Sequence, residues 1–386
     1  MPKCNILSNH LSITVDGKWQ PCCYFNRQPD NEFSTDDYTY DQYKQSDFYV
    51  NLKNTMDSDN WHSGCNDCKR REDHGSLSQR QRFNKILSGN DTVEYIEVSF
   101  SNECNIACLT CGPWASSKWT TVAKNNDLGD FLSWKFINPG KNDISHIKND
   151  IISVDQLQNL KLLKILGGEP TLMPSVYKFL EALKEADILK NISLVFNTNC
   201  TFFPKKILPF LPEAKAVHVS LSIDAIGPLN DYVREGSNWN TTLKVVDEWK
   251  HYASTYTNIN LKIANVVSAL TVHQIDKVLE FSKTVTDVPP FYIILSSPKS
   301  FCIDALPKEY IDTFIEKYKD IDELKDIYNI LVNSTYNPRY NAQLVHYLDT
   351  MEKISGKTLR DYIDNISFLD YTQSRYRKNN KRLYRK

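Results

Sequence analysis

The sequence lacks any long uninterrupted apolar stretch. No apolar run approaches the roughly 18 residues that a transmembrane helix needs. The first residues, MPKCNILSNHLSITVDGKW, also lack the basic-then-apolar pattern of a signal peptide. We therefore expect a cytoplasmic protein with no membrane partner.

The chain also lacks an excess of charge of one sign. Lys and Arg number 46 against 47 Asp and Glu, so no global field attracts nucleic acid or an anionic membrane. Basic residues gather in 374–386, where seven of the thirteen residues are Lys or Arg. This tail could contact nucleic acid phosphates or an acidic peptide, but we favour a solvated tail.

Solenoid-type internal repeats are absent too. With 386 residues, 41% of them hydrophobic, the chain can form one large α/β domain plus a smaller module. Residues 28–49 are polar, and the stretch before Val93 shows little regular periodicity. A small module held together by a metal would fit there.

From Val93 onward, apolar strand-like runs alternate with helix-like segments. Helices are expected from Pro174, near 241–252, and after a capping box formed by Thr271 and Gln274. Apolar stripes beyond Pro307 predict further helices. The predicted strands are 93–100, 160–166, 192–197, 216–222, 261–267 and 291–295.

Such alternation predicts parallel βαβ units, and six strands suit a partial barrel better than a closed eight-stranded one. Functional residues are then expected at the carboxyl ends of the strands.

Ten cysteines are many for a protein from a reducing compartment, where they favour metal binding or catalysis over disulfides. Cys200 and Cys302 stand alone and are interpreted as small buried hydrophobic residues. The other eight fall at positions 4, 22, 23, 65, 68, 104, 108 and 111.

Cys104, Cys108 and Cys111 form a C-x3-C-x2-C motif directly after the first predicted strand. Three thiolates on a four-iron cluster leave one iron open, whereas an electron-transfer cluster normally has four cysteine ligands. An open iron can bind a substrate or cosubstrate. A zinc site is the alternative interpretation of the triplet.

This motif resembles that of the radical S-adenosylmethionine (radical SAM) superfamily. The resemblance implies a [4Fe-4S] cluster on the triplet and S-adenosylmethionine as cosubstrate. The family usually has an aromatic residue before the third cysteine, where this chain has Thr110.

Gly167, Gly168 and Glu169 follow the second predicted strand and precede a proline. Glycines let a ligand approach the backbone, and a carboxylate can pair with an ammonium group. In the family that this chain resembles, a GGEP-like motif binds the amino group of S-adenosylmethionine, which implies that role for Glu169.

Ser222, at the end of the fourth strand, and Arg234 resemble a Ser, SxD and Arg arrangement found in peptide-modifying members. The resemblance implies that Ser222 contacts the cosubstrate and Arg234 its carboxylate, a role that suits the planar guanidinium. Asn199, after the third strand, is a further candidate, although it could be an ordinary turn residue. No motif identifies a general acid or base.

Near the amino terminus, Cys4, Cys22, Cys65 and Cys68 supply four thiolates, the number that a fully ligated cluster or a structural zinc requires. The G-x4-C and C-x2-C spacings resemble SPASM/twitch auxiliary-cluster modules, which normally follow the barrel. They imply a second [4Fe-4S] cluster, with zinc as the alternative. Either Cys22 or Cys23 could be the ligand, and the spacing favours Cys22.

The expected fold is therefore α/β, with a partial (β/α)6 barrel of radical SAM type, a small metal-stapled N-terminal module and a helical C-terminal extension. The expected parts are a twitch-like module (1–90), a radical SAM core (91–300), a helical extension (301–373) and a basic tail (374–386).

The expected activity is reductive cleavage of S-adenosylmethionine to a 5'-deoxyadenosyl radical, followed by hydrogen abstraction from a substrate, with a peptide or protein as one candidate. An external one-electron donor such as flavodoxin or ferredoxin is expected as partner. The alternative is a non-catalytic zinc protein that contacts nucleic acid.

Overall fold

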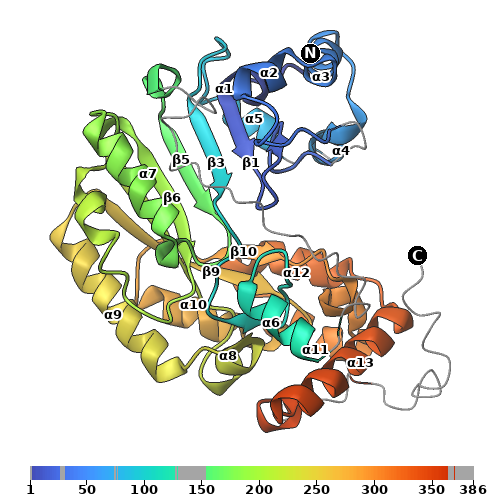
Figure 1. Cartoon of the computed structure of the whole chain (residues 1–386). Coiled ribbons are helices and arrows are strands. Elements are labelled where there is room, and N and C mark those ends of the chain that lie inside the picture. Colours follow the sequence, from blue (N-terminus) through green and yellow to red (C-terminus); the bar gives the residue numbers. More distant parts are fainter. Residues whose placement is uncertain are drawn as a thin grey trace.

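The computed structural model describes residues 2–26, 31–73, 75, 77–126, 128, 154–363 and 369. The predicted basic tail lies outside these residues. One sheet runs through the molecule, with helices on its outer side and a group of helices at one end (Figure 1).

The sheet has eight strands in the order β10-β9-β7-β6-β5-β3-β1-β2. Six of them, β3 to β10 without the short β4 and β8, pair in parallel and match the six predicted strands. The strands are β1 (His10–Ile13), β2 (Trp19–Gln20), β3 (Tyr95–Ser99), β4 (Ala107–Cys108), β5 (Leu162–Leu166), β6 (Ser193–Thr198), β7 (Ala216–Ser222), β8 (Arg234–Glu235), β9 (Ile259–Val267) and β10 (Phe291–Ile294). The α/β prediction is confirmed, and the open strand order agrees with a partial barrel.

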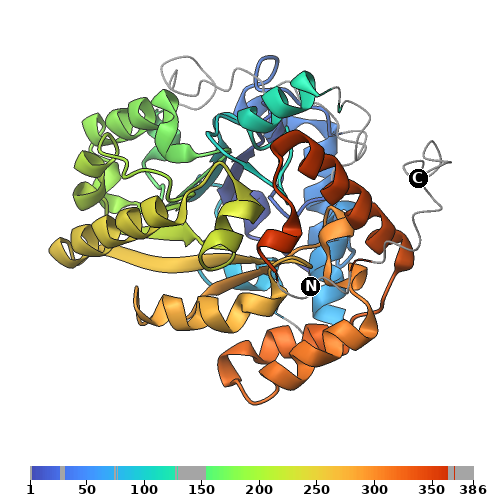
Figure 2. The ribbon, with the colours of Figure 1, turned by 90° about the horizontal axis from the view of Figure 1, so that it is seen from below.

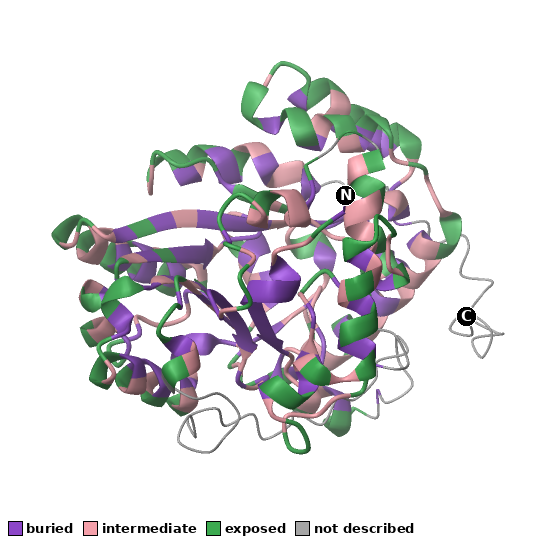
Figure 3. Ribbon diagram, turned by 90° about the horizontal axis from the view of Figure 1, so that it is seen from above, coloured by how far each residue is buried: buried purple, intermediate pink, exposed green. Residues whose placement is uncertain are grey.

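The described α-helices are α1 (Ile6–Asn9), α2 (Tyr40–Gln45), α3 (Asp47–Asp57), α4 (Asn66–Asp73), α5 (Gln79–Phe83), α6 (Ser117–Asn125), α7 (Pro174–Glu185), α8 (Pro228–Val233), α9 (Trp239–Thr255), α10 (Ile275–Lys283), α11 (Lys308–Tyr318), α12 (Lys325–Val332) and α13 (Pro338–Ser355). Helix α7 begins at Pro174 as predicted, and it buries Val176, Phe179, Leu180 and Leu183 against the outer face of the sheet. Buried residues concentrate in the central strands, while the outer faces of the surrounding helices are exposed (Figure 3). None of the described helices combines the length and apolarity needed to cross a membrane.

The helix expected after Thr271 begins later than predicted. The Thr271 hydroxyl donates to the carbonyl of Val266 and accepts from the backbone N–H of Ser268, so it is not free to cap a helix. Gln274 instead accepts a hydrogen bond from the backbone of Ile226. A 3-10 turn fills residues 272–274, and α10 starts at Ile275.

The C-terminal extension is helical, as predicted, and packs on the end of the barrel where the strands finish (Figure 2). Helices α11 and α12 bury the expected apolar stripes. The longest of the described helices, α13, was not predicted individually. The hydroxyl of Tyr347 on α13 donates to the carbonyl of Leu109 at 3.1 Å, so this helix contacts the cysteine loop directly.

The N-terminal segment extends the barrel sheet. Strand β1 pairs in parallel with β3, from His10 opposite Tyr95 to Ile13 opposite Val98. Apolar side chains of the segment, including Leu11, Trp19 and Leu52, belong to the same buried cluster as the outer face of the barrel. The segment therefore folds onto the barrel through a strand and a shared core.

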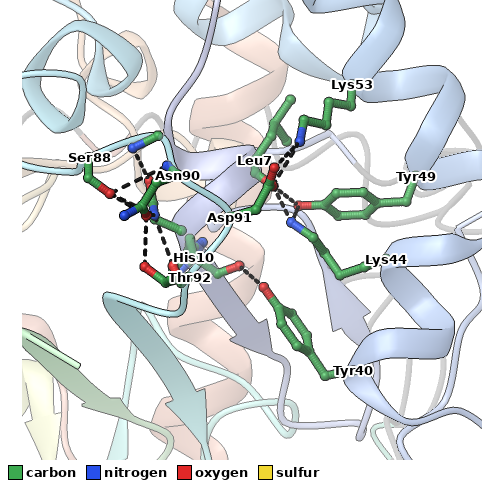
Figure 4. Close-up of polar contacts among 12 residues, drawn as sticks. Leu7, His10, Tyr40, Lys44, Tyr49, Lys53, Ser88, Asn90, Asp91 and Thr92 are labelled. Atoms are coloured by element: carbon green, nitrogen blue, oxygen red, sulfur yellow. Dashed lines mark hydrogen bonds and ion pairs between the residues drawn. The ribbon is translucent and has the colours of Figure 1, made fainter. Parts of the chain in front are cut away.

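A buried amide locks β1 in place. The side chain of Asn9 is fully buried; it donates to Asn90 and to the carbonyl of Thr92, and accepts from the backbone N–H of Gly89. On the other side of the strand, the hydroxyl of Tyr49 donates to the carbonyl of Leu7 (Figure 4). The bonds of Asn9 hold the loop before β3, and that of Tyr49 holds α3, against the first residues of the chain.

We predict that Asn9→Ala destabilises the fold by about 2 kcal/mol, because it leaves buried backbone groups without partners. Urea unfolding followed by circular dichroism measures the change. The control is Asn60→Ala, which removes an exposed amide from the same segment. Equal unfolding midpoints for the two variants would contradict this role of Asn9.

Candidate functional site

The loop after β3 carries the cysteine triplet at the carboxyl end of the parallel strands. It is paired to a distant part of the chain, because β4 and β8 form a two-stranded antiparallel ribbon with Cys108 opposite Arg234. Further bonds fix the loop: the indole of Trp119 donates to the carbonyl of Cys108, and the hydroxyl of Ser117 accepts from the backbone of Cys104. The triplet is therefore anchored from α6, α13 and the segment after β7.

One cavity joins every residue that the sequence assigned to the cluster and cosubstrate. It encloses about 610 Å³ of empty space, counting its open mouth, which lies within the range of small-molecule sites of roughly 300–1,000 Å³. Its lining includes Cys104, Cys108, Cys111, Gly167, Gly168, Glu169, Asn199, Ser222 and Arg234.

The three thiols are close enough to influence one another electrostatically. Burial raises the pKa of Cys104, that of Cys108 to about 11 and that of Cys111 to about 12. The positive charge of Arg234 acts in the opposite direction on all three pKa values. Because metals bind the thiolate, a cationic neighbour at this depth favours the form that a metal needs.

The two glycines have a packing role that the sequence interpretation missed. A Cβ atom on Gly168 would lie 2.2 Å from the carbonyl oxygen of Glu103, and one on Gly167 would lie 2.4 Å from that of Ser101. Gly167 also has a φ of +121°, which disfavours other residues. The glycines therefore let the loop after β5 pack against the cysteine loop, and both still line the cavity.

Glu169 is buried at the wall of the cavity. Its carboxylate accepts hydrogen bonds from the hydroxyl of Thr171 at 2.5 Å and from the backbone N–H of Asn199 at 2.6 Å. Burial raises its pKa, and these hydrogen bonds act against the rise. A carboxylate held at this depth is suited to pair with a cationic group of a ligand.

Asn199 and Ser222 reach the same cavity from neighbouring strands. The amide of Asn199 donates to the side chain of Asn105 at 2.8 Å and lies 3.9 Å from the sulfur of Cys104. Asn199 therefore connects the end of β6 to the cysteine loop, and Ser222 lines the cavity at the end of β7.

Arg234 has a partner to which the sequence interpretation gave no role. Its guanidinium donates to Asp224 at 2.7 Å, and both side chains are more than nine-tenths buried. Burial lowers the pKa of Arg234, but the negative charges at Cys108 and Asp224 outweigh this effect and raise it. Asp224 is the aspartate of the SxD pattern, so the motif contained the signal for this pair.

The N-terminal cysteines Cys4, Cys22, Cys65 and Cys68 also come together. Cys22 interacts electrostatically with Cys4 and Cys65, and Cys4 with Cys68. Burial raises the pKa of Cys4 and of Cys65 to about 12, and that of Cys22 well above its usual value.

Cys23 interacts with the adjacent Cys22, but its other charged neighbours are Glu97 and Lys164 of the barrel, and none of Cys4, Cys65 and Cys68 is among them. The surroundings of the two adjacent cysteines thus support Cys22 as the member of the N-terminal group.

Within the described part of the chain, no group of three or more His, Cys, Asp or Glu side chains is arranged to hold a metal ion. Neither cysteine group is thus already arranged as a site for an ion, and the metals expected at both remain proposals.

The model of the radical SAM superfamily matches residues 98–267. This range contains the cysteine triplet, the Gly-Gly-Glu-Pro motif, Ser222 and Arg234.

Curated relatives carry the name GTP 3',8-cyclase. The protein from Helicobacter pylori strain J99 is 27% identical over 240 residues, which cover 61% of this chain and 66% of the relative. The protein from Aliarcobacter butzleri is 29% identical over 195 residues, or 50% of this chain and 52% of the relative. The chain thus spans just under two thirds, or less, of these relatives.

Solved structures with related folds include Streptococcus suis SuiB bound to S-adenosylmethionine, at 15% identity and a TM-score of 0.39, covering 78% of this chain and 56% of that one. TYW1 with a lysine-pyruvate adduct bound aligns at 15% identity and a TM-score of 0.33, covering 59% of this chain and 74% of that one. These TM-scores are low, so the assignment rests on the sequence match.

The sequence match confirms the prediction of an enzyme and sets aside the non-catalytic alternative. Residues 98–267 of the chain therefore match a radical SAM superfamily domain.

Proposed function

We propose that this protein cleaves S-adenosylmethionine reductively at a [4Fe-4S] cluster held by Cys104, Cys108 and Cys111, and modifies its substrate by hydrogen abstraction. The observation that carries the proposal is the shared cavity. Three thiols, a buried carboxylate and a buried guanidinium meet there from three separate parts of the sequence.

When bound, the cluster and S-adenosylmethionine supply a reductive C–S cleavage that yields methionine and a 5'-deoxyadenosyl radical. Cys104, Cys108 and Cys111 would hold such a cluster, whose three thiolate ligands are one fewer than its irons. Glu169 accepts the ammonium group of the methionine moiety. Asn199 and Ser222 fix the orientation of the cosubstrate from the ends of β6 and β7.

Arg234 has two tasks in this proposal. One nitrogen of its guanidinium is bound to Asp224, which fixes the side chain. Its Nε is buried and has no hydrogen-bond partner among the described residues, and the side chain lines the cavity. A carboxylate of the cosubstrate would supply the missing acceptor, and the positive charge favours the thiolates of the triplet.

Cys4, Cys22, Cys65 and Cys68 are proposed to hold a second, fully ligated [4Fe-4S] cluster. Support comes from their number and from their mutual proximity. Such a cluster could relay electrons or bind substrate, and an external donor such as flavodoxin or ferredoxin would deliver the electron for cleavage. A structural zinc remains the alternative for this group.

For the substrate, the relatives named GTP 3',8-cyclase make GTP one candidate. A peptide or protein is the second candidate, because the Ser222, Asp224 and Arg234 arrangement resembles that of peptide-modifying members.

We predict that Cys108→Ala abolishes formation of 5'-deoxyadenosine, because a cluster needs all three thiolates. Anaerobic protein reduced with dithionite and analysed by chromatography gives the measurement. Cys302→Ala removes a buried thiol outside the cavity and should retain full product formation. Full turnover in the Cys108 variant would refute the assignment of the triplet.

We predict that Glu169→Gln weakens binding of S-adenosylmethionine about tenfold or more, because it removes a charge-assisted hydrogen bond worth roughly 1.5–3 kcal/mol. Equilibrium dialysis against reconstituted protein measures the affinity, and iron content verifies that the cluster is intact. Glu103→Gln, an exposed carboxylate in the cysteine loop, is the matched control. Unchanged affinity in the Glu169 variant argues against its role.

We predict that Cys22→Ser lowers the iron content from about eight to about four atoms per chain, because one of two four-iron clusters is lost. Cys23→Ser should retain both clusters. Iron, sulfide and zinc assays after anaerobic reconstitution decide the matter. Stoichiometric zinc with only four irons in the wild type would establish the zinc alternative for the N-terminal site.

A further inference from the structure

The inner face of the barrel sheet differs sharply from its outer face. Side chains alternate along each strand, so every second residue shares a face. The residues that pack against the outer helices are apolar: Ile96, Val98, Leu163, Ile165, Leu194, Phe196, Val217, Val219, Leu221, Leu261 and Ile263. The alternate residues are mostly polar: Glu97, Lys164, Asn197, His218, Ser220 and Lys262. A sheet face with polar side chains is suited to contact with water or a ligand.

The inner face carries more positive than negative charge. Glu97 and Lys164, paired side by side in the sheet, form an ion pair at 2.8 Å. Lys262 has no such partner: in the described part of the chain its ammonium pairs with no carboxylate and lies 4.9 Å from the centre of the Phe291 ring. Burial and the positive charge of Lys164 both lower its pKa. One cation on this face is therefore left unbalanced.

Lys262 lies beside the proposed cosubstrate site. In the sheet register, Ser222 pairs with Ala264, and Ala264 pairs with Phe291. Ser222 lines the cosubstrate cavity, so Phe291 is level with that cavity, two strands away. Lys262 is two residues before Ala264, on the same face and roughly 7 Å deeper along the strand.

The last barrel strand presents exposed apolar side chains on the same face as Lys262. Phe291 and Ile293 alternate with Tyr292 and Ile294, which pack into the C-terminal core. Phe291 is 51% exposed and Ile293 is 37% exposed, although both belong to a strand of the central sheet. An exposed aromatic ring next to an unbalanced cation is suited to a ligand that has both a planar or apolar part and an anionic group.

The inner face also connects with a second cavity. This cavity shares Ala115, Leu166 and Gly167 with the first and extends to Glu97 and Cys23. It encloses about 840 Å³ of empty space, counting its mouth. It lies at β1, β3 and β5, across the first cavity from Lys262 and Phe291, so a substrate at these two residues would lie on the inner face of β9 and β10.

We propose that the substrate is an anion, which presents a carboxylate or phosphate group to Lys262 and a planar or apolar part to Phe291. This inference rests on the proposed function, because it places the group to be modified within the barrel beside the cosubstrate. The ion pair with Glu97 holds Lys164 in place, so Lys262 is the residue that provides the free charge.

The test uses small probes that carry the two kinds of anionic group on one ring. Phenyl phosphate and benzoate, with the neutral benzyl alcohol as reference, are titrated calorimetrically into reconstituted full-length protein that contains S-adenosylmethionine. We expect at least one anionic probe to bind, and the preferred one identifies phosphate or carboxylate. Lys262→Met should weaken its binding about tenfold or more, the loss expected for a hydrogen bond to a charged group.

Two further variants keep the test decisive. Lys262→Arg preserves the charge and should retain most of the affinity, which a merely structural role for the lysine stem would not explain. Lys244→Met, which removes an exposed lysine on α9, should leave the affinity unchanged. Equal binding by the wild type and Lys262→Met would overturn the inference, as would anionic probes that bind no better than benzyl alcohol.

Measurement of 5'-deoxyadenosine in the same preparations separates the two proposals. Wild-type protein that binds an anionic probe through Lys262 but forms no 5'-deoxyadenosine would refute the proposed function and leave the anion site standing. Wild-type protein that cleaves the cosubstrate but binds probes independently of Lys262 would refute only the anionic substrate.

Discussion

The functional site depends on one buried ion pair, between Arg234 and Asp224. Asp224 follows β7 directly, whereas Arg234 lies on β8 opposite Cys108 of the cysteine loop. The pair therefore ties the end of the fourth barrel strand to the loop after the first. Loss of one partner from such a pair costs about 3–5 kcal/mol, because the other charge stays buried. The positive charge of Arg234 also lies near the three thiols of the cysteine loop. The residue that holds the loop therefore also favours the thiolate form of its cysteines.

The parts of this site that the sequence predicted are those in which local pattern and tertiary role agree. The apolar runs of five of the six strands, all but β10, are buried on at least one face, and the cysteines and the GGEP motif follow the ends of β3 and β5. The stripe of Val176, Phe179, Leu180 and Leu183 on α7 is the buried stripe. For these strands and for α7, the spacing of apolar residues in the sequence is enough to predict the structure.

Other parts could not be predicted because distant partners decide them. Thr271 has the pattern of a helix cap, but the carbonyl of Val266 uses its hydroxyl. The glycines of GGEP were interpreted as space for a ligand, whereas the nearest atoms are the carbonyls of Ser101 and Glu103 in another loop. Strand β1 has only four residues, and it is a strand because β3 offers it a parallel edge. The residues next to each of these positions in the sequence give no sign of such long-range contacts.

Strand β1 also explains how a cysteine group that precedes the barrel in the sequence can contact it. An auxiliary module of the kind that the N-terminal cysteines resemble normally follows the barrel, and here the cysteines precede it. Strand β1 places them beside β3: Cys4 and Cys22 pack near Tyr95 at the amino end of β3, whereas the cysteine triplet follows its carboxyl end. The chain can therefore bring a second metal group next to the barrel from its amino-terminal side, without a segment after the barrel.

The central claim is that three cysteines leave one iron open to the cavity and that S-adenosylmethionine binds this iron. Pulsed electron-nuclear double resonance on the reduced protein, with S-adenosylmethionine labelled with ¹⁵N in its amino group, tests it most directly. The account predicts a ¹⁵N hyperfine coupling that requires Cys104, Cys108 and Cys111. A reduced cluster without that coupling, at a concentration of S-adenosylmethionine that saturates binding, would contradict it.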